Sequence, residues 1–338
     1  MKRSILRTTT LFLPFLGLPA MAAADEARLA EIATFFSEAN VIAGPDLVDC
    51  TLSGGAETTC FRITVAPTPP THETGPWCPT NISDGPEAGG IWFYDGETVD
   101  VDGDFIANLA TLYGDTNWQL FDQDTGDIRF TGTLEACEAA ARPDVDPEYQ
   151  NHCVQCLPEY MPDDASLTYV IPLEPVLSDT PARTNQAGSG IAFNGGRLDG
   201  PAPVDAILGA YTIAAFDDCG GHVNPHVGYH YHAVTDCLDE SPNSSGPITT
   251  EEITATGQGP QIGIAMDGFQ IFGHHMADGS DPVGLDACNG HASDDLDYHY
   301  HAGAAGSNAI LGCLTAQTGC TLADPNGTCD ASQRPRRP

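Results

Sequence analysis

The second half of this chain contains one residue pattern twice, and that repetition restricts its fold more than any other feature. Gly-Ile-Ala-Phe-Asn-Gly at 190–195 corresponds to Gly-Ile-Ala-Met-Asp-Gly at 263–268, and the offset between them stays constant. Further on, 217–233 and 286–302 share Asp-x-Cys-x-Gly-His and Tyr-His-Tyr-His-Ala at a slightly shorter constant offset. Chance does not preserve so many residue types at fixed spacing. The sequence therefore predicts an internally duplicated β unit, with copies at about 190–237 and 263–313.

The remaining sequence predicts a mainly β fold with some α structure (α+β), loop-rich and stabilised by disulfides. Glycine (36) and proline (26) are abundant, and helical patterns are short. We expect helices at 25–40, at 104–113 with Asp104 as N-cap, and at 133–142, and a strand at 167–173. The expected division is a signal peptide at 1–24, an N-terminal α+β domain with disulfides at 25–165, the duplicated domain at 166–330, and a disordered tail at 331–338.

The first residues and the charge indicate where such a chain works. Lys2, Arg3 and Arg7 precede an apolar run at 11–18 and small residues at 20–24, which is typical of a secretory signal and too short for a membrane span. We therefore expect a periplasmic or secreted protein. Without this segment, 9 basic residues face 47 acidic ones, a formal charge of −38. Nucleic acid and anionic membranes are excluded as partners, and the acidity serves solubility or attracts cations.

Each copy of the pattern carries three histidines at fixed spacing. On a strand, His230 and His232 project from one face while the flanking tyrosines project from the other. The preceding His222, brought back by a short turn, can complete a site. Three neutral imidazoles with an open position suit copper or zinc. A lone histidine would more often be an ordinary core or surface residue, but six in register predict metal ligands: His222, His230, His232, His291, His299 and His301.

Other residues near the histidines can support them or add a ligand. Asp217 and Asp286 can orient an imidazole through its free N–H, or they can simply form turns. The tyrosines are expected to pack the opposite strand face, with a redox or supporting role as the alternative. His274 and His275 lie outside the repeat and are extra ligands or an ordinary loop. The full set of possible extra ligands and supporting groups is Asp217, Asp286, Tyr229, Tyr231, Tyr298, Tyr300, His274 and His275.

The twelve cysteines are even in number, as expected of disulfides in an oxidising compartment. We expect Cys219–Cys237 and Cys288–Cys313 to close the two loops that carry the histidines, each stabilising by about 3 kcal/mol in the loop-entropy model. Cysteine as a metal ligand is the alternative. Cys50 and Cys60 flank a Gly-Gly turn and predict a disulfide-closed hairpin. Cys78, Cys137, Cys153 and Cys156 are expected to pair among themselves, with a redox or metal site at the C-x-x-C as the alternative.

The motifs of the second half resemble the YHYH-domain family. The resemblance rests on Tyr-His-Tyr-His at 229–232 and 298–301, Asp-Ala-Cys-Asn-Gly-His at 286–291 and Ile-Ala-Met-Asp-Gly-Phe at 264–269. It covers roughly 165–320 and is specific, because several motifs occur in order. The resemblance implies an exported bacterial protein with a defined domain, and it implies little chemistry.

Three functions are compatible with these features. The first is a copper-dependent oxidoreductase acting on a small-molecule substrate. The second is a protein that sequesters or delivers copper or zinc without turnover. The third is a zinc hydrolase, in which the ion lowers the pKa of bound water to about 7. Common hydrolase, kinase and dehydrogenase fingerprints are absent from the sequence. Alternating aspartates at 100–104 and 122–127 suggest calcium only weakly, because they lack the twelve-residue ligand spacing and also suit turns.

Overall fold

The computed structural model describes residues 18–142, 144–184, 188–239, 257–294 and 296–333. Most of the signal segment expected at 1–24 and of the tail expected at 331–338 lies outside these residues. Within them the chain is mostly β, with few helices and six disulfides, so the expected loop-rich α+β class is confirmed. None of the helices in the described ranges combines the length and apolar character needed to cross a bilayer.

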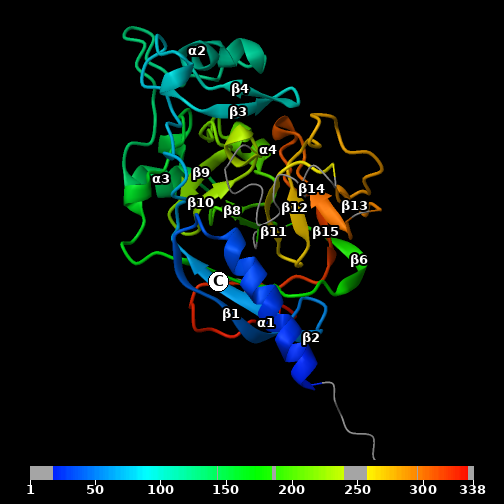
Figure 1. The fold of residues 1–338 in the computed structure, drawn as a ribbon. Helices are drawn as coiled ribbons and strands as arrows, with labels where there is room; N and C mark the ends of the chain where they lie inside the picture. Colours follow the sequence, from blue (N-terminus) through cyan, green and yellow to red (C-terminus); the bar gives the residue numbers. More distant parts are fainter. Residues whose placement is uncertain (1–17, 143, 185–187, 240–256, 295, 334–338) are drawn as a thin grey trace, which may run out of the picture.

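An eight-stranded sheet forms the centre of the second half, in the order β13-β14-β12-β11-β7-β8-β10-β9. Figure 1 shows β9 and β10 on one side of this sheet and β13 and β14 on the other. The strands are β7 (Gly190–Ala192), β8 (Arg197–Leu198), β9 (Gly221–Asn224), β10 (Gly228–Tyr231), β11 (Gln261–Ala265), β12 (Gln270–Phe272), β13 (Gly290–His291) and β14 (His299–His301).

Strand pairing follows one scheme on both sides of the sheet centre. On one side β7 and β8 pair antiparallel, β8 and β10 parallel, and β10 and β9 antiparallel. On the other side β11, β12, β14 and β13 pair with the same sequence of directions. The halves join where β7 and β11 pair antiparallel. A Cβ atom on Gly190 would crowd the Ile264 carbonyl oxygen and one on Gly263 the Ile191 carbonyl oxygen, so glycine lets the central strands approach.

A second sheet of four strands combines the two ends of the chain with its middle, in the order β1-β2-β5-β16. Its strands are β1 (Val41–Thr51), β2 (Glu57–Val65), β5 (Leu167–Pro172) and β16 (Cys320–Leu322). Because β2 pairs with β5 over Val65–Leu167 to Cys60–Pro172, hydrogen bonds cross the boundary expected near residue 165. The Cys50–Cys60 disulfide links β1 and β2, as the hairpin predicted.

Short elements complete the fold. The remaining strand pairs are β3 (Ile91–Tyr94) with β4 (Glu97–Asp100), and β6 (Leu177–Arg183) with β15 (Cys313–Ala316). The helices are α1 (Leu18–Phe35), α2 (Gly103–Leu112), α3 (Leu134–Ala140), α4 (Val204–Gly209) and α5 (Asp236–Asp239), with 3₁₀ turns at Pro86–Ala88, Pro147–Tyr149, Pro158–Tyr160 and Ala305–Ser307.

The helix boundaries differ from expectation in ways that capping explains. Asp102, and not Asp104, is the N-cap of α2, because its Oδ1 accepts the Phe105 N–H at 2.7 Å. Asp104 instead lies in the first helical turn. Thr133 caps α3 as a hydroxyl acceptor for Ala136 N–H, and α3 ends at Ala140. The first helix begins at Leu18, before the expected start at residue 25.

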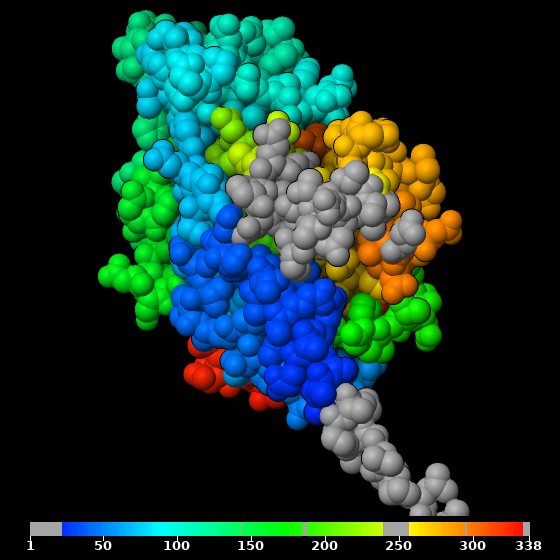
Figure 2. All heavy atoms as spheres, viewed as in Figure 1, coloured from blue at the N-terminus to red at the C-terminus, as the bar shows by residue number. Residues whose placement is uncertain are grey.

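One hydrophobic core continues through both halves of the chain. Phe35 of α1 stacks on Phe193 with ring centroids 4.6 Å apart, and Trp92 of β3 stacks on Phe216 at 5.4 Å. In Figure 2 the blue surface of the N-terminal segment lies beside the green surface around β6, which belongs to the second half. The expected boundary near residue 165 therefore falls inside a continuously packed region.

Candidate metal centres

The first histidine triad is built on the β9–β10 hairpin. His222 of β9 lies opposite His230 of β10 in the antiparallel register, and their Nε2 atoms are 3.1 Å apart. His232, one residue beyond β10, lies two positions along the chain from His230 and so on the same face. Its ring centroid is 4.9 Å from that of His230 and 5.1 Å from that of His222. The three side chains thus converge on one point, as the sequence predicted.

Backbone carbonyls fix which imidazole nitrogen faces that point. His230 Nδ1 lies 3.1 Å from the Gly228 oxygen, and His232 Nδ1 lies 2.8 Å from the Gly200 oxygen. A carbonyl oxygen only accepts, so each Nδ1 carries the proton when the ring is neutral. Each Nε2 then presents a lone pair to the other two rings. Converging lone pairs repel one another unless a proton or a cation lies between them.

The second triad repeats this geometry at the other edge of the sheet. His291 of β13 and His299 of β14 have Nε2 atoms 3.1 Å apart. The Nδ1 atoms of His291, His299 and His301 lie 3.0, 2.8 and 3.0 Å from the carbonyl oxygens of Val283, Asp297 and Gly273. His301 Nε2 is fully buried and has no hydrogen-bond partner among the described residues. A buried nitrogen without a partner is costly, and a bound cation would satisfy it.

Burial lowers the pKa of five of these imidazoles, those of His222, His230, His232, His299 and His301, and so favours their neutral form. The His230 and His232 side chains are buried, and those of His299 and His301 are completely so. Desolvation lowers the pKa of His230 well below its usual range and that of His301 to about 4. Neutral imidazole is the form that binds metal ions. In each triad, one nitrogen from every ring lies within 4.8 Å of the others, a separation that one ion can bridge.

The two triads are separate sites. Four strands, β8, β7, β11 and β12, lie between β10 and β14 in the sheet. Five strand spacings correspond to roughly 24 Å along the sheet. The arrangement therefore excludes one coupled cluster of six histidines.

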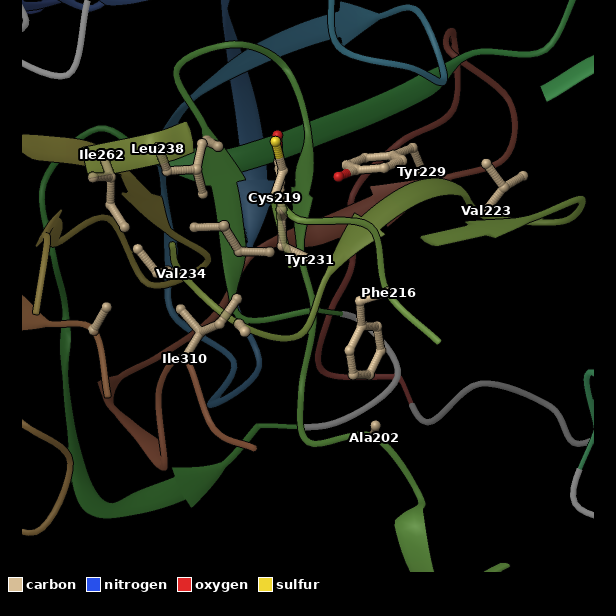
Figure 3. Packing of buried hydrophobic residues seen from close by; sticks show 14 of the residues in the cluster. Ala202, Phe216, Cys219, Val223, Tyr229, Tyr231, Val234, Leu238, Ile262 and Ile310 are labelled. Carbon is tan, nitrogen blue, oxygen red and sulfur yellow. The ribbon is translucent and has the colours of Figure 1, made fainter. Parts of the chain in front are cut away.

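The tyrosines lie on the opposite strand face and bind carboxylates or amides there. Tyr229 donates to Asp217 at 2.8 Å, and Tyr231 bonds to the Asn194 amide at 2.8 Å. Figure 3 shows Tyr229 on one side of the strand that carries it and Phe216 on the other. In the second unit, Tyr298 donates to Asp286 and Tyr300 to Asp267, each at 2.7 Å. These hydroxyls are engaged away from the triads.

Asp217 and Asp286 act as turn formers. Asp217 Oδ1 accepts the N–H groups of Cys219 and Gly221 at 3.1 and 3.2 Å. Asp286 does the same for Cys288 and Gly290 at 2.8 and 3.0 Å. The alternative role of orienting an imidazole is carried by backbone carbonyls instead. Burial raises the pKa of Asp217 to about 6.

A family comparison fits this geometry. A model described as YHYH protein matches residues 168–283. Over these residues the chain contains a YHYH domain. The match contains the whole first unit and β11 and β12 of the second, and it begins close to β5. No curated protein and no solved structure matches the chain.

Two phenylalanines that sequence reasoning missed lie against the two triads. The Phe216 ring is 4.9 Å from His222 and 5.3 Å from His232, and the Phe272 ring is 5.0 Å from His299. They come from different places in the repeat, since Phe272 corresponds to Asp199 when the glycine-rich strands are aligned. The difference between Phe272 and Asp199 was the only sequence signal that the surroundings of the two triads differ.

Asp267 and His72 were also missed. Asp267 is completely buried, and desolvation raises its pKa to about 6. The first unit has Asn194 at the matching position, so the repeat itself contained this signal. His72 lies outside the matched segment, with Nε2 3.2 Å from the Tyr229 hydroxyl, and burial lowers its pKa. Nothing in its sequence context indicates that contact.

A cavity of about 580 Å³ opens onto the first triad. All three histidines of that triad line it, together with α4 and the segment after α3. Its wall includes Val154, Ala202, Ile207 and Val223, and the Arg197–Asp199 ion pair at 3.2 Å.

His274 and His275 gather around Asp281 at the surface of the YHYH domain. His275 Nδ1 is 3.1 Å and His274 Nε2 is 3.7 Å from the Asp281 carboxylate. His274 Nδ1 lies 3.0 Å from the Ala302 oxygen, so this residue is adjacent to the second triad without joining it. The structure therefore places both histidines in a third, exposed group of potential ligands.

All twelve cysteines form disulfides. The predicted pairs Cys219–Cys237 and Cys288–Cys313 are confirmed and close the triad loops over 18 and 25 residues. The two cysteines of the C-x-x-C bind different partners, Cys78–Cys153 and Cys137–Cys156, and Cys320 pairs with Cys329. With every sulfur in a disulfide, cysteine is not a metal ligand here.

The aspartates considered for calcium serve turns and caps. Asp102 caps α2, and Asp122 Oδ1 accepts the N–H groups of Asp124 and Thr125 at 2.8 and 3.1 Å. Neither segment belongs to a potential ligand group found among the described residues.

Proposed function

We propose that this protein binds one metal ion in each histidine triad, and that the ion is copper. The observation that carries the proposal is the convergence of three histidine nitrogens, with the His230 and His232 rings held by carbonyl oxygens at Nδ1. An isolated cluster of buried lone pairs is unfavourable, and a cation turns the same arrangement into a stabilising one. The second triad supports the proposal independently, because it has the same geometry.

The ligand set favours copper over zinc. Each triad offers imidazole nitrogens only, without a thiolate or carboxylate. Among divalent ions of the first transition row, copper binds such nitrogen sites most tightly. Three protein ligands leave a coordination position open. Bound copper would supply one-electron redox chemistry, and we extend the proposal to an oxidoreductase working in the periplasm or outside the cell.

The duplicated unit is part of the proposal. The strand directions are the same on both sides of the β7–β11 pair, and one triad lies at each edge of the sheet. Both observations support a duplication of a metal site together with its supporting strands. The copies then diverged, as Asp199 and Phe272 illustrate.

Sequestration or delivery of copper without turnover is the second candidate. The complete burial of His299 and His301 favours it for the second triad, because two of its three histidines are shielded from solvent. Zinc hydrolysis has less support. It needs a carboxylate base beside the bound water, whereas Asp217 and Asp286 bond to tyrosines on the other strand face.

The test is metal analysis of protein purified from a periplasm, with His232→Ala and His301→Ala variants. We expect two ions per chain in the parent and one in each variant. His226→Ala is the control, because His226 is exposed in the β9–β10 hairpin and lies outside the triads. Electron paramagnetic resonance (EPR) separates Cu(II) from zinc, which is silent. Unchanged metal content in both triad variants would overturn the proposal.

A further inference from the structure

We propose that the two triads are not equivalent, and that the first is a binding site for a small organic anion with an apolar body. This inference rests on the proposed function, because the anion's oxygen is taken to occupy the open position of the first ion. The second triad holds its ion without such a ligand. The argument comes from the cavity, from the residues that differ between the two units, and from the charges of the wall.

The cavity has the size of a ligand site and ends on the metal ligands. Its volume of about 580 Å³ is in the range of sites for small molecules. His222, His230 and His232 all form part of its wall. A molecule inside can therefore reach the point where the three Nε2 atoms converge.

One substitution between the repeats accounts for the difference between the triads. Asp199 follows β8 and lines the cavity. The matching residue in the second unit is Phe272, which is buried and packs its ring against His299 and His301. A phenyl ring therefore occupies the side of the second triad where the first unit has a short carboxylate turned toward Arg197.

The wall determines the chemical class of the ligand. Much of it is aliphatic, formed by Ala140, Ala202, Ala206, Ile207, Val154, Val223 and Val227. Such a surface favours an apolar body of several carbon atoms.

The wall holds two arginines and one aspartate, in contrast to the rest of this acidic chain. Arg197 pairs with Asp199 inside the wall, and Arg142 at the rim pairs with Asp144 and Asp146. The chain as a whole has 12 basic and 47 acidic residues. A bound ion adds positive charge to the cavity, and an anionic oxygen complements it.

Benzoate is a suitable probe, because it combines an aromatic body with a carboxylate. We expect a benzoate titration of the copper-loaded protein to change the EPR signal of one of the two ions and to leave the other unchanged. Acetate has the same head group without the body, and benzyl alcohol has the body without the charge. Both should need at least a tenfold higher concentration for half-saturation.

Variants on α4 locate the site. Ile207→Trp fills the cavity, and Leu208→Trp makes the same change next to it on a residue outside the wall. We expect both variants to keep two ions, and only Ile207→Trp to weaken the benzoate response by tenfold or more. Ala206→Leu, a smaller change in the same wall, should weaken it to a lesser extent.

The outcomes separate the two proposals. If the parent binds no metal, the proposed function fails, and this inference fails with it. If metal binds but both ions respond to benzoate, or neither does, or Ile207→Trp and Leu208→Trp respond alike, the non-equivalence is wrong while the metal sites stand. In His301→Ala, which keeps only the first ion, the whole remaining signal should respond.

Discussion

At the scale of single residues, the candidate metal centres depend on carbonyl oxygens as much as on histidines. The carbonyls of Gly200 and Gly273 bond to Nδ1 of the last histidine of each triad, at 2.8 and 3.0 Å. These two glycines occupy the same position of the repeat. The tautomer needed for metal binding is thus specified by backbone carbonyls, which cannot be recognised from the residue types in the sequence.

The buried Asp267 gives a prediction about pH. Its pKa is about 6 in the folded protein and 3.8 in the unfolded chain, so the folded state binds the proton more tightly. Its contribution to the free energy of unfolding is full below about pH 4 and is lost as pH rises through about 6. Asp267→Asn introduces the residue found at the matching position of the first unit. It should abolish this loss of unfolding free energy with rising pH.

Thermal unfolding at pH 4 to 8, with a chelator present, measures the effect. The stability of Asp267→Asn relative to the parent should rise by about 3 kcal/mol across this range. The pKa of Asp217 is also raised, so Asp217 lowers the free energy of unfolding as pH rises in both proteins. This contribution cancels when the variant is compared with the parent. A difference that stays constant with pH would contradict the burial argument.

At the scale of elements, much of the local structure was predictable and the long-range pairing was not. Periodicity and capping placed α2 and α3 within a few residues, and spacing predicted three of the six disulfide pairs, including Cys219–Cys237. The β7–β11 pairing joins segments that lie far apart in the sequence, and no local preference specifies it. Neither the cavity nor the position of Phe216 was predictable, because both arise where distant segments pack.

The two central glycines lead to a test of that pairing. Gly263→Ala places a methyl group against the Ile191 carbonyl oxygen, between strands whose spacing hydrogen bonds fix. We expect a loss of about 1–3 kcal/mol in the free energy of unfolding. Gly209→Ala is the control, because no atom lies within 4 Å of its added methyl group. Chemical denaturation of both variants checks this, and equal stability would argue against close approach at β7–β11.

The disulfides near the triads support a second prediction at this scale. Removing Cys288–Cys313 with two alanines frees the loop that carries the second triad, and should cost about 3 kcal/mol of stability. The affinity of the second triad for copper should fall, while the first retains its ion. The matched control removes Cys320–Cys329, which closes a loop outside the triads and should leave both ions bound. Denaturation first shows that both variants are folded. A copper titration of each then distinguishes the loss at the second triad from the control.

At the scale of the whole molecule, the YHYH domain is continuous with the segment before it. β2 and β5 pair across the expected boundary, Ile91 bridges Phe216, and Phe35 stacks on Phe193. The Phe216 side of the first triad is therefore supported by residues far from the matched segment. Sequence reasoning separated the halves because their motifs differ, whereas packing does not follow motifs.

A fragment of residues 166–333 tests this continuity. It would expose the edge of β5 and the apolar surface that α1 and β3 cover. We expect it to lack a cooperative thermal transition that the full chain shows by circular dichroism. Cooperative unfolding of the fragment, with both ions bound, would establish an independent domain and contradict this expectation.

The position of the orienting carbonyls has a consequence for how the protein matures. His222, His230 and His232 belong to one hairpin and meet as soon as it forms, but the Gly200 oxygen comes from the segment that follows β8. Before β8 joins β10, the His232 ring is free to present either nitrogen. Under the proposed function, tight loading of the ion is therefore coupled to completion of the sheet, and a partly folded chain would release metal that the finished protein retains.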